Sequence, residues 1–243
     1  MMNRSATWKS RVAVVLAAGM IASGGPALAD DVGHDPLEGF NRAMFAVNEG
    51  LDTVAIKPVA QVYDFVTPLP VRAGVGDFFG NIADFRNALN NALQGKLANA
   101  GTDLGRLLIN STIGIFGLFD VASELGLEKH DEDFGQTLAV WGWDDSSFLY
   151  WPLVGPRTVR DTGGLIVDIY TDPTWGTINK SVAVRNSLVA LRFVDVRAAL
   201  LPTDKVVEEA ALDKYAYVRD AYLQRRRNQI FDGRPPRIDD SLD

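Results

Sequence analysis

The feature that most constrains this chain is a charge-free, mostly apolar run enclosed by Arg106 and Asp120, with the sequence LLINSTIGIFGLF. A helix that spans a membrane needs about 20 apolar residues to cross a hydrocarbon core of ~30 Å. As a helix this run would extend only about 20 Å, and Gly114 and Gly117 would each cost about 1 kcal/mol relative to alanine. The run is therefore either a buried core segment or a segment that enters lipid part of the way.

The first 29 residues have the pattern of a cleaved export signal. Arg4, Lys9 and Arg11 precede a short apolar stretch, and residues 27–29 (ALA) form a small-residue cleavage site. An uncleaved N-terminal anchor helix is the alternative. Removal of the leader takes the formal net charge from −7 to −10. So acidic a chain lacks the basic face that non-specific nucleic-acid binding needs.

The sequence contains no cysteine. This excludes disulfides, zinc–thiolate sites, cysteine nucleophiles and acylation of an N-terminal cysteine. It does not exclude a membrane location, because burial of apolar side chains can hold a protein at a bilayer.

Helical patterns dominate the chain after the leader. Asp35, Pro36 and Glu38 form a helix-start signal, and Pro58 interrupts or bends the pattern that follows. Further helices are expected over 71–94, from about 98 to 110–112, and over 134–141, 155–172, 177–201 and 213–231, with breaks near 194–195 and at Pro202. Residues 143–154 are expected to be extended or irregular, and no hairpin turn is evident. The sequence predicts a mostly α fold with one domain at 30–232 and a disordered tail at 233–243.

No pattern of catalytic or metal-binding residues stands out. Residues 74–80 (GVGDFFG) lack the spacing of a nucleotide-binding glycine motif and follow no strand. Residues 130–133 (HDED) could hold a cation, but they match no EF-hand and fit a solvated loop better. Ser111 lacks the sequence of a nucleophile elbow and is expected to help end a helix. We therefore expect no enzymatic activity, no cofactor and no metal.

Aromatic and basic residues gather around the apolar run. Tryptophan prefers sites with one apolar and one wet end, including membrane interfaces, although core packing is an equally good explanation here. Four of the five tryptophans fall within a short segment, at positions 141, 143, 151 and 175. Several cations bracket the same region and could contact lipid phosphates, with an Arg160–Asp161 ion pair as the alternative: Lys96, Arg106, Arg157 and Arg160.

Short motifs spread along the chain carry a more specific signal. They are 35–42 (DPLEGFNR), 70–75 (PVRAGV), 77–81 (DFFGN), 94–96 (QGK), 110–114 (NSTIG), 117–120 (GLFD), 133–138 (DFGQTL), 155–161 (GPRTVRD) and 217–225 (YVRDAYLQR). Each is weak alone, but their order and their span make the set specific. The sequence resembles the MlaA/VacJ family of Gram-negative outer-membrane proteins.

The resemblance implies a ring-like assembly of short amphipathic helices in the inner leaflet of the outer membrane, on its periplasmic face. An amphipathic central channel would let mislocalised phospholipid leave the outer leaflet and pass to a soluble periplasmic carrier, without catalysis. This retrograde transport maintains outer-membrane lipid asymmetry, and a trimeric porin is the implied membrane partner. Candidate residues for the lipid path are Gly114, Phe116, Gly117, Phe119, Phe134 and Trp141. We expect Gly117→Val to impair lipid asymmetry more than protein abundance.

The chain departs from the family pattern in two ways. It lacks the acylated cysteine of typical members, and Asp84 stands where many members have proline, which leaves the local helix start open. The first departure keeps an alternative alive: a periplasmic structural or scaffold protein of the cell envelope that has kept the fold without membrane seating. A secreted lipid hydrolase is a third hypothesis, for which the sequence provides no site.

Overall fold

The structure is a computed structural model that describes residues 35–143, 146–176 and 181–236. The predicted signal peptide (1–29) and the end of the predicted tail (237–243) lie outside the described residues. The described residues from Pro36 onward form one compact unit, which is mostly helical, as predicted. None of the described helices is both long enough and apolar enough to cross a membrane.

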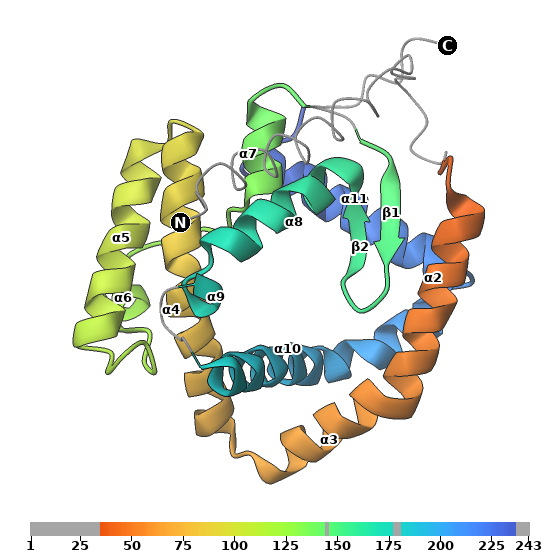
Figure 1. The fold of residues 1–243 in the computed structure, drawn as a ribbon, viewed down its shortest axis with the longest axis horizontal. Coiled ribbons are helices and arrows are strands. Elements are labelled where there is room, and N and C mark those ends of the chain that lie inside the picture. The colour runs from red at the N-terminus through yellow and green to blue at the C-terminus, as the bar shows by residue number, and fades with distance from the viewer. Residues whose placement is uncertain (1–34, 144–145, 177–180, 237–243) are drawn as a thin grey trace, which may run out of the picture. The chain divides into compact units, whose positions relative to one another are not determined.

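The colours of Figure 1 mark the order of the elements along the chain. The helices are α2 (Glu38–Leu51), the π-helical segment η1 (Asp52–Ile56), α3 (Lys57–Val66), α4 (Leu69–Leu93), α5 (Leu97–Thr112), α6 (Val121–Glu124), α7 (Phe134–Val140), α8 (Val159–Thr171), α9 (Pro173–Gly176), α10 (Val182–Ala210) and α11 (Lys214–Ile230). The strands are β1 (Phe148–Trp151) and β2 (Gly155–Thr158).

The π-helical segment η1 explains how the chain passes Pro58 without ending the helix. A proline ring clashes with the carbonyl four residues earlier and offers no N–H to it, and that carbonyl belongs to Val54, inside η1. A wider π turn absorbs such a conflict. The path from α2 to α3 therefore continues to Val66, and Thr67 ends it immediately before Pro68.

α4 and α5 form a helical hairpin, joined by a tight turn at Gly95, whose φ of 80° suits glycine. α4 is continuous from Leu69 to Leu93, and Asp84 lies in its interior. No helix therefore starts at the position where many family members have proline. α5 ends at Thr112, as predicted, and the Thr112 hydroxyl donates to the carbonyl of Leu108 (2.7 Å).

An antiparallel hairpin pairs β1, which lies in the segment predicted to be extended or irregular, with β2, which lies in a segment predicted to be helical. The expectation that the chain has no hairpin turn was therefore wrong. Asn41 of α2 holds β1 in place, because its Nδ2 donates to the carbonyl of Phe148 (3.1 Å) and its Oδ1 accepts from the N–H of Tyr150 (2.8 Å). The contact joins residues more than 100 positions apart, so local patterns could not reveal it.

The helix predicted to restart at Gly155 begins later. Residues 155–158 form β2, and α8 starts at Val159. The Thr158 hydroxyl caps this helix by accepting from the N–H of Asp161 (3.1 Å). The prediction placed the start one strand too early, because Gly-Pro is also compatible with a turn into a strand.

α10 runs through both positions where breaks were predicted, including Pro202 in its interior. Long-range contacts hold it against α3 and η1. Asp195 accepts a hydrogen bond from the Tyr63 hydroxyl (2.8 Å), and Arg197 donates two hydrogen bonds to Asp52 (2.7 Å each). Tertiary contacts outweigh the local cost of proline here.

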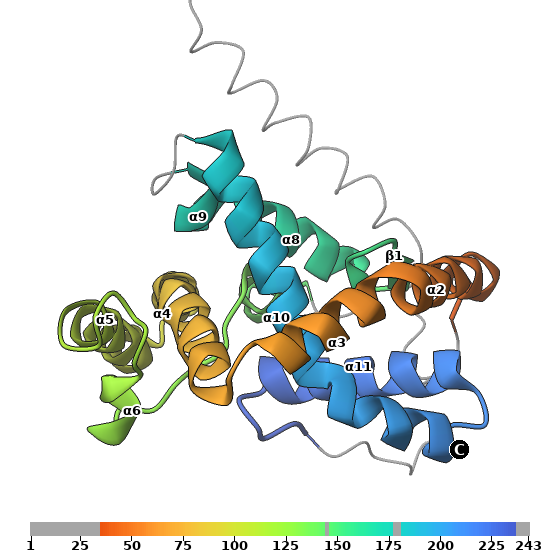
Figure 2. The ribbon, with the colours of Figure 1, turned by 90° about the horizontal axis from the view of Figure 1, so that it is seen from below.

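The described elements lie around a closed circuit (Figure 1). α2, η1, α3 and α4 form one part in sequence order, and α7, α8 and the β-hairpin form the rest. Contacts of α4 with α7 and of β1 with α2 close the circuit, while α10 lies along α3. Figure 2 shows α9 near one end of α10 and α11 near its other end. This is the mostly helical, ring-like arrangement that the resemblance implied.

Polar side chains fill much of the interior of this unit. Its buried apolar residues are mostly alanines, besides an aromatic cluster of Phe148, Tyr150 and Tyr215. The largest fully buried side chains are instead Arg106, Gln136, Asn41, Asn87, Asn90, Asn91, Thr137, Asp84, Asp103 and Asp161. Such groups are tolerated inside a protein only when they are hydrogen-bonded or paired.

Candidate functional site

Large apolar side chains face outward on most elements of the circuit. Apolar side chains recur at helical spacing on α2, and the face that they form is exposed, since Phe40, Val47 and Leu51 are exposed while Asn41 is fully buried. α4 behaves alike, with Phe85 and Leu93 exposed. The most exposed large apolar residues include Val54, Phe65, Leu69, Leu97, Leu108, Ile113 and Phe116. Extensive apolar exposure of this kind marks surfaces that meet a membrane, a ligand or a partner.

The apolar run ends in a strained turn between α5 and α6. Ile115 (φ 52°), Phe116 (φ 57°) and Gly117 (φ 85°) all adopt left-handed backbone conformations, which are rare for residues other than glycine and rarest for β-branched ones. The turn projects Phe116 and Phe119 outward, with 76% and 58% of their surfaces exposed. Strain of this type costs about 1–3 kcal/mol per residue and persists only where neighbouring structure enforces it.

Arg106 provides that enforcement from beneath the turn. Its guanidinium is fully buried and donates to both carboxylate oxygens of Asp120 (2.9 and 2.8 Å) and to the carbonyl of Leu127 (2.6 Å). Burial alone would raise the pKa of Asp120, but hydrogen bonds from Ser123, Asn110 and Arg106 outweigh it and hold that pKa below its ordinary value. The two ends of the apolar run are thus tied together by their flanking charges.

Asp84 of α4 lies beside the same guanidinium, but its carboxylate has fewer favourable contacts than that of Asp120. Its Oδ2 is 3.4 Å from Arg106 Nε, and neither of its carboxylate oxygens accepts a hydrogen bond within the described chain. Burial raises the pKa of Asp84 to about 6, against the opposing charges of Lys129 and Arg106. The interior therefore holds a carboxyl group that is only partly paired with its neighbouring cation.

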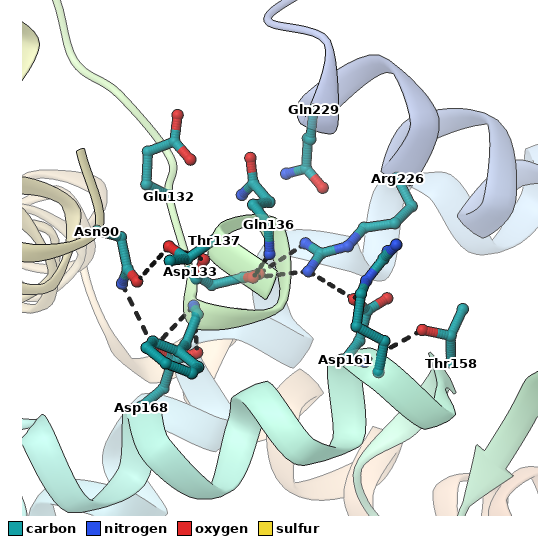
Figure 3. Close-up of polar contacts among 12 residues, drawn as sticks. Asn90, Glu132, Asp133, Gln136, Thr137, Thr158, Asp161, Asp168, Arg226 and Gln229 are labelled. Atoms are coloured by element: carbon teal, nitrogen blue, oxygen red, sulfur yellow. Dashed lines mark hydrogen bonds and ion pairs between the residues drawn. The ribbon is translucent and has the colours of Figure 1, made fainter. Parts of the chain in front are cut away.

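A second buried network joins α7, α8 and α11 (Figure 3). Arg226 reaches from α11 to both oxygens of Asp133 (2.6 Å each) and to Asp161 (2.8 Å). Asp161 also accepts from the Tyr222 hydroxyl (2.6 Å). Burial opposes ionisation of Asp133 and Asp161, but Arg226 lowers the pKa of both carboxyls below the ordinary value.

A second set of hydrogen bonds in Figure 3 joins α4 to α7 and α7 to α8. The Thr137 hydroxyl donates to Asn90 Oδ1 (2.8 Å), and the N–H of Phe134 donates to Asp168 (3.1 and 3.2 Å). Burial, and then the charge of Asp133, raise the pKa of Asp168 to about 6. No sequence pattern singled out Asn90 or Asp168 as a polar residue of this interior.

One sequence signal could have found part of this interior. Asp84, Asn87 and Asn91 recur at spacings of three and four on α4, which places them on one helix face. Asparagine is a poor choice inside an exposed helix. In a protein whose outer surface meets an apolar medium, such a polar stripe therefore indicates the side of the helix that faces the interior of the protein.

The predicted lipid-path residues fall into two groups. Gly114, Phe116, Gly117 and Phe119 lie in the turn after α5, whereas Phe134 and Trp141 lie on or next to α7, with their rings in edge contact at 5.7 Å. The first group adjoins Asn81 of α4, because a β-carbon on Gly117 would lie 2.6 Å from it. The second adjoins Leu93, whose carbonyl accepts from the Trp141 indole (3.1 Å). These two points on α4 are about 18 Å apart along the helix, so the six residues do not form one cluster.

An apolar cavity of about 290 Å³ lies beside the first group. Phe116 lines it together with residues of α4 and α5 and with Pro173. Its polar edge is the hydrogen bond from Asn81 Nδ2 to Ser111 Oγ (2.9 Å). Ser111 thus lies in the last turn of α5, at the rim of an apolar cavity, where its hydroxyl accepts from the amide of Asn81.

Most of the cations singled out in the sequence serve internal contacts. Lys96 pairs with Glu132 (3.2 Å), and Arg160 pairs with Asp161 (3.1 Å), as the alternative hypothesis held. Arg106 pairs with Asp120. The side chains of residues 130–133 likewise contact separate partners elsewhere in the chain, and His130 Nδ1 lies 2.8 Å from Asp103 Oδ1. Arg157 differs: no ion pair of its guanidinium occurs within the described ranges, and its Nε is buried without an acceptor.

The fold and this surface define a class of protein: a predominantly helical unit that directs large apolar side chains outward around a polar, ion-paired interior. Comparison with known proteins gives the class a family. The model of the MlaA lipoprotein family matches residues 33–229, and the chain belongs to that family.

Individual relatives agree with the assignment. The chain is 34% identical over 196 residues to the intermembrane phospholipid transport system lipoprotein MlaA of Escherichia coli, a match that covers 79% of this chain and 76% of that protein. It is 33% identical over 198 residues to an uncharacterized protein of Rickettsia bellii, covering 81% and 77%. A solved structure described as the "structural basis for maintenance of bacterial outer membrane lipid asymmetry" matches with a TM-score of 0.70 and 30% identity, over 83% of this chain and 100% of that one.

Proposed function

We propose that this protein transports phospholipid at the outer membrane without catalysis. It removes mislocalised phospholipid from the outer leaflet and passes it to a soluble periplasmic carrier, which maintains lipid asymmetry. The observation that carries the proposal is that large apolar side chains face outward while polar side chains fill the interior. The fold is also similar to a solved structure whose description concerns outer-membrane lipid asymmetry. The name of the Escherichia coli relative, as part of an intermembrane phospholipid transport system, supports the same role.

The polarity gives a physical route for lipid movement. Acyl chains remain in contact with apolar surface, while the headgroup passes along a polar interior, so that neither part has to enter an environment of opposite polarity. In this proposal Gly114, Phe116, Gly117 and Phe119 line the path at the α5–α6 turn, and Phe134 and Trp141 line it at α7. No bond is made or broken.

The exposed apolar surface supports a proposal for where the protein is seated. We place it in the periplasmic leaflet, exported by its signal peptide, with a trimeric porin as neighbour. No cysteine is present to carry an acyl chain, but one such chain gives only marginal binding, with K of about 10⁴ M⁻¹. Burial of the exposed apolar residues of α2, α3 and α5 in lipid can contribute as much membrane affinity as one acyl chain, since burying one large apolar side chain contributes about 1.5–3 kcal/mol.

The test is deletion of the gene in a strain without a paralogue, followed by complementation. We expect more phospholipid in the outer leaflet and greater detergent sensitivity, both reversed by the wild-type gene. Unchanged asymmetry in the deletion strain would refute the proposal.

The missing cysteine favours one other candidate, a periplasmic scaffold that has the fold but no membrane seating. Fractionation separates the two candidates. Recovery of the mature protein only in the soluble periplasmic fraction, together with normal asymmetry after deletion, would establish the scaffold in place of the transporter.

A further inference from the structure

A small polar pocket lies on α11, away from the apolar cavity. It has a volume of about 170 Å³, and α11 lines it through Tyr222, Arg225, Arg226 and Gln229. The opposite wall comes from Arg157 of β2 and from Asp131 and Asp133. Pockets that enclose a drug-sized ligand measure about 300–1,000 Å³. This one suits a small charged group, not acyl chains.

We propose that this pocket binds a phosphate-type oxyanion between Arg157 of β2 and Arg225 of α11. A phospholipid headgroup and free inorganic phosphate share this chemistry. Binding of the anion itself is independent of the proposed transport function, whereas its identification as a lipid headgroup rests on that function.

Arg157 is the first reason for the proposal. Its backbone is fixed in β2, opposite Leu149 of β1, and its side chain is half-buried. Its Nε is buried without an acceptor, and no carboxylate pairs with it in the part of the chain that the structure describes. A partly buried cation without a partner is costly, and an anion in the pocket would remove that cost.

The aspartates on the pocket wall do not cancel this charge, because they already have partners. Asp133 binds Arg226 through both oxygens. Asp131 lies 3.5 Å from Arg86 and 3.4 Å from Arg225, and it accepts from Gln229 Nε2 (3.1 Å). Arg157 therefore supplies positive charge in excess of the local carboxylates.

Arg225 and Gln229 add donors from the other wall. The contact of Arg225 with Asp131 is long and largely exposed, with 72% and 61% of the two side chains accessible, and such pairs contribute little. Arg225 can therefore exchange this partner for a better one. Guanidinium groups bind phosphate oxygens in pairs. Gln229 lies beside Arg226 on the same side of the network in Figure 3, so donors converge on the pocket from two elements.

The experiment uses the full-length protein purified in detergent. Calorimetric titrations with inorganic phosphate and, separately, with glycerophosphoglycerol measure binding to the wild type, Arg157→Gln and Arg185→Gln. Arg185 is a matched control, because it lies on α10, outside the pocket, and its guanidinium donates to the adjacent Asn186 (3.3 and 3.2 Å). We expect Arg157→Gln to bind at least tenfold more weakly than the wild type and Arg185→Gln to bind normally.

The outcomes separate the two sources of the anion. Tighter binding of the phosphodiester identifies a headgroup site, and tighter binding of inorganic phosphate identifies a free-phosphate site. Absence of binding to the wild type, or unchanged binding by folded Arg157→Gln, overturns the proposal. A strain that carries Arg157→Gln tests the link to transport. Loss of anion binding with intact lipid asymmetry would remove the pocket from the lipid route and leave the proposed function standing.

Discussion

Gly117 lies directly against Asn81: a β-carbon built on Gly117 would be 2.6 Å from both Cβ and Nδ2 of Asn81. Its φ of 85° also disfavours any side chain. Asn81 belongs to the middle of α4, so the turn after α5 packs closely against that helix at Gly117. The relationship changes what a substitution at Gly117 should do.

We expect Gly117→Val to lower the amount of folded protein, and to impair lipid asymmetry only as a consequence. This revises the expectation drawn from the sequence, because the valine side chain has neither space nor an accessible backbone conformation. The destabilisation should be at least ~2 kcal/mol. Thermal unfolding and immunoblotting measure it.

Gly105→Val is the matched control for this substitution. Gly105 lies in α5, and no atom comes within 4 Å of a β-carbon built there. Its replacement should change stability by less than ~0.5 kcal/mol, since valine and glycine differ little in helix propensity. Normal abundance of Gly117→Val with lost asymmetry would restore the lipid-path explanation.

Arg106→Gln should destabilise the protein by about 3–5 kcal/mol, because it leaves the Asp120 carboxylate without its bidentate partner and removes a donor from Leu127. Chemical denaturation measures the loss. The double variant Arg106→Gln/Asp120→Asn should recover part of it, since position 120 then carries no unpaired charge, while Asp84 still lacks its contact with Arg106. If the double variant is less stable than the sum of the two single changes, the ion pair is not the cause.

Asp84→Asn should stabilise the protein in a pH-dependent manner. Burial raises the pKa of Asp84 from 3.8 to about 6, so the folded state holds this proton more tightly than the unfolded chain does. The resulting stabilisation is complete below pH 3.8 and is lost as the pH rises through 6, which amounts to ~3 kcal/mol at most. Asparagine avoids that loss.

The measurement for Asp84→Asn is the difference in unfolding free energy from the wild type at pH 4 and pH 8. We expect little difference at pH 4 and a gain of about 1–3 kcal/mol at pH 8. A destabilised variant at pH 8 would mean that the Asp84–Arg106 attraction exceeds the cost of burying the carboxylate.

Helices could be predicted from the sequence better than the contacts that each helix makes in the folded protein. The helix that ends at Thr112 was predictable, because the residues that end it are adjacent in the chain. β1 was not, since its position depends on Asn41, more than 100 residues away. Apolar faces could be located on 38–51 and 81–94, but periodicity does not tell which side of a helix meets solvent. The paired Arg160 and the unpaired Arg157 look alike in sequence, and only tertiary contacts distinguish them.

Phe116 offers a prediction in which stability and membrane seating move in opposite directions. Its φ of 57° is unfavourable for phenylalanine, and its side chain is 76% exposed. Phe116→Gly should therefore raise stability by about 1 kcal/mol, because glycine adopts this conformation freely. The same change removes an outward aromatic side chain, which should weaken partitioning into phospholipid vesicles about tenfold. Thermal unfolding and vesicle flotation measure the two effects. Gln224→Gly, at an exposed position of α11, is a control that should not alter partitioning. If Phe116→Gly floats as well as the wild type, the turn does not enter lipid, and the apolar run is held outside the bilayer by the Arg106–Asp120 pair.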